Sequence, residues 1–113
     1  MARAKLEVFG DSSVRLAGFA KALAHPARID ILRRLAVAGE LPCMAVVGEL
    51  PLSQPACSRH INELLRAGLL KSRTVRTQIL FRVDHKALEG FCTAMSRTLH
   101  SQPPKAPRRT TSR

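Results

Sequence analysis

Helix-breaking signals divide this chain into short segments, and their spacing restricts its fold more than any other feature of the sequence. His25-Pro26 interrupts the first apolar repeat, because the residue before a proline is disfavoured in helical geometry. Gly39, the stretch from Gly48 to Pro51, and Gly68 mark three further ends. No stretch between the breaks approaches the roughly 18 apolar residues of a membrane span. The chain is therefore expected to fold as several short packed elements.

Apolar residues recur at helical spacing in the first two segments. A first helix is expected after a cap at Ser12 or Ser13, with an inward stripe of Val14, Ala17, Ala20, Leu23 and Ala24. Pro26 suits the first turn of a second helix that ends at Gly39. The inward side of this second helix is expected to comprise Ile29, Leu32, Leu35 and Ala36.

Two further helices are expected in the middle of the chain. Pro42 opens a short third helix through Val47, and Ser53 caps a fourth that ends at Ala67. The fourth helix is strongly two-sided. Its expected inward residues are Cys57, Ile61, Leu64 and Leu65, and its expected outward residues are Gln54, Ser58, Arg59 and Asn62.

The last third of the chain predicts a hairpin and one more helix. Two extended runs, Leu69–Thr74 and Ile79–Val83, are joined by the polar link Val75–Gln78. Asp84 is expected to cap a helix whose apolar stripe is Leu88, Phe91, Cys92, Met95 and Leu99. This order predicts a mainly α fold with a small β-hairpin, the winged helix-turn-helix. The domain is expected to span residues 12–100, between a flexible arm (1–11) and a disordered basic tail (101–113).

The charge of the chain is strongly positive and unevenly placed. Nineteen Lys and Arg residues against eight Asp and Glu give a formal net charge of +11. Residues 53–82 hold six basic side chains and one acidic one, and residues 101–113 hold four basic side chains and no acidic one. A concentration of cations on one central segment is typical of a surface that binds phosphates. Charge alone leaves nucleic acid, an anionic membrane and an acidic protein open as partners. Together with the predicted winged helix-turn-helix, it favours double-stranded DNA as the expected partner.

Two separated motifs resemble one known family, the ArsR/SmtB repressors. The run ALAHPARIDIL at 22–32 resembles the family signature ALxxPxRxxIL. The run LSQPACSRHI at 52–61, followed by Leu64 and AGL at 67–69, resembles the recognition-helix pattern LSQPxVSRHLxxLxxAGL. The similarity covers about residues 14–100. It implies a homodimer joined through the first and last helices, repression of a nearby operon, and release by a metal or redox signal.

The resemblance and the side-chain chemistry together suggest the residues that touch DNA. Gln54, Ser58, Arg59 and Asn62 have the side chains that read base edges in the major groove. Phosphate contacts are expected from the start of the fourth helix and from the predicted hairpin, which is the wing of this fold. The whole expected set is Ser53, Gln54, Pro55, Ser58, Arg59, His60, Asn62, Arg73, Arg76 and Gln78.

The effector site departs from the family pattern. In the family site on the last helix, Lys86 and Arg97 stand where two of the four ligands are expected, beside Asp84 and His100. The family's Cys-x-Cys position holds Cys43 alone. The remaining candidate ligands for Zn²⁺, Ni²⁺ or As(III) are Asp84, His85, His100, Cys43 and Cys92. A Cys43–Cys92 dithiol switch and control by a partner regulatory protein stay open as alternatives.

Other classes of function have less support. No arrangement of nucleophile, base and orienting group indicates an enzyme. A winged helix that binds RNA or protein is the alternative from another class, although the chain has only four aromatic residues for stacking on bases. The three cysteines are widely spaced and no signal peptide is apparent. These features predict a cytoplasmic protein without a membrane partner.

Overall fold

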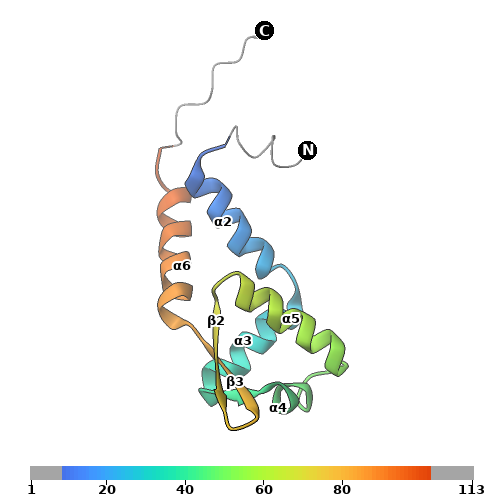
Figure 1. The fold of residues 1–113 in the computed structure, drawn as a ribbon. Coiled ribbons are helices and arrows are strands. Elements are labelled where there is room, and N and C mark those ends of the chain that lie inside the picture. Colours follow the sequence, from blue (N-terminus) through green and yellow to red (C-terminus); the bar gives the residue numbers. More distant parts are fainter. Residues whose placement is uncertain (1–8, 103–113) are drawn as a thin grey trace.

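The computed structural model describes residues 9–102, and its elements follow the predicted order (Figure 1). In chain order they are α2 (Asp11–Ala22), α3 (Pro26–Ala38), β1 (Leu41–Pro42), α4 (Cys43–Val47), α5 (Gln54–Arg66), β2 (Leu70–Val75), β3 (Gln78–Val83) and α6 (His85–Leu99). The mainly α fold with a hairpin is therefore confirmed. Most of the predicted arm (1–11) and tail (101–113) lies outside the described residues.

The helix ends lie close to the predicted breaks. His25 caps α3, because its Nδ1 accepts the Ala27 N–H at 3.0 Å. Gly39 ends α3 with a φ of 89°, a backbone conformation that only glycine adopts easily. The predicted Ser12 or Ser13 cap is wrong: α2 begins at Asp11, its N-cap is Gly10, and no side chain caps it.

The core lies between α3, α5 and the sheet, and it corrects several predicted inward positions. Ile31, Leu32 and Leu35 are the buried residues of α3. The predicted Ile29 is 42% exposed, because it lies two residues from Ile31 and thus on nearly the opposite side of the helix. The other predicted inward residues that are exposed are Ala17, Ala24 and Ala36.

The wing is a hairpin that extends from a three-stranded antiparallel sheet with strand order β1-β3-β2. β2 and β3 pair from Leu70 opposite Val83 to Val75 opposite Gln78, so the link is shorter than predicted and consists of two residues. Strand β1 was not expected from the sequence. It spans only two residues, and Leu41 pairs with Phe81 across long sequence separation.

Helix α6 leaves the sheet and packs beside α2 (Figure 1). Asp84 caps it as predicted, since its Oδ1 accepts the Ala87 N–H at 3.1 Å. The rings of Phe19 and Phe91 join the two helices, with centroids 5.4 Å apart. No residue of α6 is buried, and Cys92 and Leu99 of the predicted apolar stripe are exposed. None of the helices within residues 9–102 is long and apolar enough to cross a membrane.

Replacing Leu64 with alanine is expected to lower the free energy of unfolding by about 3 kcal/mol. Leu64 lies fully buried on α5, so the substitution leaves a cavity in the core. Urea unfolding followed by circular dichroism measures the loss. Leu65→Ala, at the half-buried neighbouring position, is the matched control and should cost less than half as much. Equal losses would contradict the assigned core face of α5.

Candidate nucleic-acid interface

Helix α5 is fixed to the core along one side. Ser53 caps it, because the Ser53 hydroxyl accepts the Ala56 N–H at 3.2 Å, and a proline occupies its first turn. Cys57, Ile61 and Leu64 are buried along its inward side, as predicted. This anchoring fixes which side chains of α5 remain at the surface.

The outer side of α5 carries most of the residues that the sequence places at DNA. Gln54, Pro55, Arg59 and Asn62 are exposed, together with Ser53 at the start of the helix. The structure leaves Ser58 half-buried at the edge of this side. An exposed row that combines amides with a guanidinium offers donors and acceptors for base edges.

His60 lies apart from that row, on the side of α5 that faces the start of α3. Its Nδ1 accepts a hydrogen bond from the Arg28 Nε at 3.1 Å. Its ring is 4.4 Å from the ring of His25, between centroids. Partial burial lowers the pKa of His60 first, and the nearby charges of His25, Arg28 and Arg59 lower it further. Sequence reasoning missed the residues around His60, although His25 and Arg28 both belong to the first family motif.

The wing presents three predicted residues to solvent, Arg73, Arg76 and Gln78. Arg73 makes a bidentate ion pair with Glu40, because its Nε and Nη2 both donate to the carboxylate at 2.8 Å. The hydrogen bond from Arg73 is the main reason that the pKa of Glu40 is lowered. Arg76 occupies the hairpin turn with a φ of 60°, the left-handed region that favours glycine. Sequence reasoning did not foresee Glu40 as the partner of the wing.

Replacing Glu40 with glutamine is expected to raise the affinity for duplex DNA about threefold. The carboxylate neutralises Arg73 in the free protein and repels phosphates beside the wing. Fluorescence anisotropy at several salt concentrations should show a steeper salt dependence for Glu40→Gln. Glu49→Gln is the control, because Glu49 is paired with Arg34 of α3 and not with the wing. A weaker complex for Glu40→Gln would instead mean that the ion pair orients the wing for binding.

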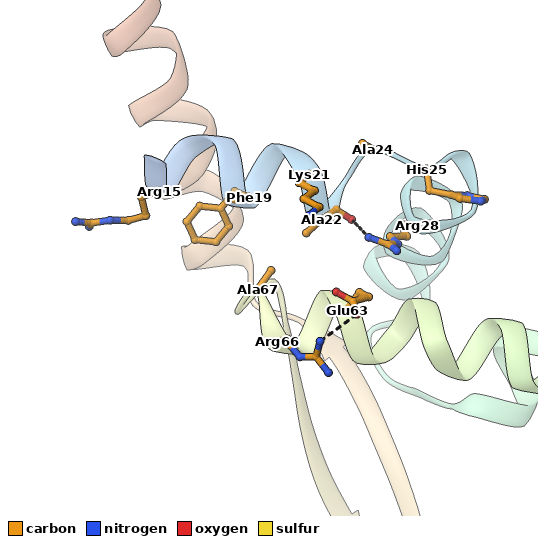
Figure 2. A pocket seen from close by; sticks show the side chains of 11 residues that line it. Arg15, Phe19, Lys21, Ala22, Ala24, His25, Arg28, Glu63, Arg66 and Ala67 are labelled. Atoms are coloured by element: carbon orange, nitrogen blue, oxygen red, sulfur yellow. Dashed lines mark hydrogen bonds and ion pairs between the residues drawn. The ribbon is translucent and has the colours of Figure 1, made fainter. Parts of the chain in front are cut away.

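Beside α5, a cavity of about 880 Å³ opens between α2, the start of α3 and the end of α5. Figure 2 shows Arg28 reaching the backbone oxygen of Ala22, and Arg66 paired with Glu63 one turn away on α5. The cavity brings together side chains that are distant in the sequence. Its lining consists of Arg15, Gly18, Phe19, Lys21, Ala22, Ala24, His25, Arg28, Glu63, Arg66 and Ala67.

Comparisons with known proteins agree with this geometry. A family model described as a helix-turn-helix domain matches residues 23–73. An HTH-type transcriptional regulator of Methanocaldococcus jannaschii is 36% identical over 70 residues, which are 61% of this chain and 79% of the relative. The fold is similar to that of an ArsR-like transcriptional regulator from a Rhodococcus species (TM-score 0.71, 27% identity, 78% of this chain and 82% of that chain). This chain belongs to the ArsR-like winged helix-turn-helix regulators.

The family assignment makes the chain a DNA-binding transcriptional regulator. Its family and fold are those of regulators, which are generally not enzymes. A homodimeric winged helix-turn-helix domain from Mycobacterium bovis, described as a possible ArsR-family regulator, is also similar (TM-score 0.62, 25% identity, 73% of this chain and 76% of that chain). The winged helix-turn-helix predicted from the sequence is thus confirmed.

The candidate metal ligands of this ArsR-like regulator are spread over separate places. Asp84 is engaged as the cap of α6 and lies 3.8 Å from the Lys71 Nζ. His85 and His100 lie at opposite ends of α6, and the His100 Nδ1 is 2.8 Å from the backbone oxygen of Ser96. Among residues 9–102, no three side chains of His, Cys, Asp or Glu gather closely enough to hold a metal ion.

The cysteines of the regulator are arranged differently from the predicted dithiol pair. Cys43 begins α4 and packs against the core, whereas Cys92 is exposed on α6, and Figure 1 shows α4 and α6 well apart. The predicted Cys43–Cys92 pair is therefore not brought together within one protomer. Cys57 is the neighbour of Cys43 instead. Burial, and secondarily Cys43, raises the pKa of Cys57 to about 11.

Proposed function

We propose that this ArsR-like regulator is a repressor that reads operator DNA with the outer side of α5 and grips the flanking phosphates with its wing. The exposed row on α5, held by three buried residues on the opposite side of the helix, carries this proposal. The side chains of this row have the polarity of a recognition helix, and the cations of the wing would extend the contact with DNA. The proposed base readers are Gln54, Ser58, Arg59 and Asn62, and the proposed phosphate contacts are Ser53, Arg73, Arg76 and Gln78.

We also propose that the repressor is a homodimer joined through α2 and α6. The α2–α6 pair leaves much apolar surface uncovered in a single chain. Leu99 is 71% exposed, and Phe91 and Met95 are only half-buried on the same stripe of α6. The homodimeric domain from Mycobacterium bovis supports the assignment. A dimer would present two copies of α5 to successive major grooves.

Release from DNA by a metal ion or an oxidant is the third part of the proposal. It follows the family resemblance, and Asp84, His85, His100, Cys43 and Cys92 are the candidate groups. Control by a partner protein is the alternative mode of release.

One binding experiment tests the DNA-binding and release parts of the proposal. A labelled duplex from upstream of the regulator's own gene is titrated with the full chain and followed by fluorescence anisotropy. Competition with RNA of the same sequence and with random duplex tests the preference for operator DNA. Zn²⁺, Ni²⁺, As(III) and a peroxide are then added separately. Release by one of them supports direct sensing, and release by none favours a partner protein. Equal competition by RNA would contradict the operator-binding role.

A further inference from the structure

One arginine joins the end of α2 to the middle of α5. The Arg28 Nη1 donates to the backbone oxygen of Ala22, the last residue of α2, at 3.1 Å (Figure 2). The Arg28 Nε donates to the His60 Nδ1 on α5, also at 3.1 Å. Since Arg28 itself belongs to the first turns of α3, a single guanidinium contacts three helices. Its two hydrogen bonds link α5 to the end of α2 and the start of α3.

The bond to His60 exists in only one protonation state. Arginine is always a donor, so the His60 Nδ1 must be unprotonated and the ring must carry its proton on Nε2. A protonated ring would have N–H groups on both nitrogens and would face the guanidinium with a like charge. The His25 Nδ1 is likewise an acceptor, because it accepts the Ala27 N–H.

The charged groups near His60 disfavour protonation of its ring. The residues that oppose protonation are His25 and Arg28, which come from the start of α3, and Arg59, which comes from α5 itself. Lys21 of α2 and the Glu63–Arg66 pair of α5 line the cavity that His25 and Arg28 also line. Glu63 is the acidic group among them, and it is already paired with Arg66 at 3.1 Å.

We propose that Arg28 is a positioning residue for the recognition helix, and that it holds α5 only while His60 is neutral, so that acidification weakens DNA binding. The proposal rests on the proposed role of α5 in reading DNA. The proposed direction of the pH dependence is distinctive. Protonation of surface histidines ordinarily strengthens binding to phosphates, because the protein becomes more positive. Because the pKa of His60 is lowered in the folded chain, the bond is still intact at the ordinary histidine pKa and is lost as the pH falls through the lowered pKa of the folded chain.

The first test needs no DNA. Two-bond ¹H–¹⁵N NMR spectra of the histidine rings are recorded on the full chain across the acid range. His60 is expected to be the neutral Nε2–H tautomer at neutral pH, and its ring should become protonated at a higher pH in the Arg28→Ala variant than in wild type, because Arg28 lowers the pKa of His60. Arg33→Ala removes the same charge from an exposed position of α3 and should leave the titration of His60 unchanged. An identical titration in wild type and Arg28→Ala would overturn the positioning role.

The second test measures DNA affinity against pH. The probe is a labelled duplex that the wild-type chain recovers from a random-sequence pool. Wild-type affinity is expected to fall about tenfold between about pH 7.5 and about pH 5.5, whereas Arg28→Ala should bind weakly throughout. His60→Asn keeps an acceptor at the δ position but cannot titrate. The DNA affinity of this variant should therefore be nearly the same at about pH 5.5 as at about pH 7.5.

The two tests separate the possible failures. A wild-type affinity that rises on acidification, or a His60→Asn variant with the same acid response as wild type, would overturn the inference. If no duplex is recovered at any pH, the proposed function fails, and the NMR titration still decides whether Arg28 holds His60. Thermal unfolding of each variant by circular dichroism confirms that the compared chains are folded.

Discussion

Replacing Arg59 with alanine is expected to weaken operator binding about a hundredfold. Arg59 is exposed on the outer side of α5, opposite the buried residues that fix the helix. A guanidinium that contacts a guanine in two places is worth about 1–3 kcal/mol against a wrong base, and a dimer would lose two such contacts. Fluorescence anisotropy with operator and with random duplex measures the change. The loss should be larger for the operator, because a base contact supplies specificity.

Arg33→Ala is the matched control for this prediction. Arg33 is exposed on α3 and lies 3.7 Å from Asp30, so its removal takes away the same charge without touching α5. It should reduce affinity less than threefold and equally for all sequences. Arg108→Ala, beyond the described residues, should likewise have a small and unspecific effect. Equal losses for Arg59→Ala and the controls would refute the assignment of α5 as the recognition helix.

Replacing Leu99 with aspartate is expected to raise the dissociation constant of the dimer at least about a hundredfold, since an unpaired charge is costly to bury at an interface. Leu99 is 71% exposed in the single chain, so the substitution should scarcely disturb the fold of one protomer. Sedimentation equilibrium measures the dissociation constant. DNA affinity should fall in parallel, because a monomer binds only one half-site.

Thr93→Asp is the control for the dimer. Thr93 is exposed on α6 and lies away from the apolar stripe, so it adds the same charge to the same helix. It should leave the dimer intact. A Leu99→Asp chain that remains dimeric would show that the protomers meet through another surface.

The elements with local signals were predictable from the sequence. Ser53, Gly39 and Asp84 mark helix ends through their own backbone or capping chemistry, and each does so in the structure. The two-sided pattern of α5 is also local, and it correctly separates Cys57 and Ile61 from the exposed residues. In all these cases the relevant partner lies within four residues along the chain.

Features that depend on distant partners were not predictable in this way. The side of α3 that faces the core is set by where α5 and the sheet pack, and this placement buries Ile31 and exposes Ile29. The bond between Arg28 and His60 spans 32 positions. The ion pair between Glu40 and Arg73 spans 33 positions. Neither residue type nor spacing identifies such pairs, because the tertiary packing alone brings them together.

The conformation of Arg76 places folding and binding in competition at the tip of the wing. Its φ of 60° is strained for any residue with a side chain, by about 1–2 kcal/mol. A glycine there would relax the hairpin but would remove a cation from the turn of the wing, which belongs to the proposed DNA surface. Directed evolution that selects only for heat resistance should therefore favour glycine at this position. The resulting variants should unfold at a higher temperature than the parent chain but bind DNA more weakly.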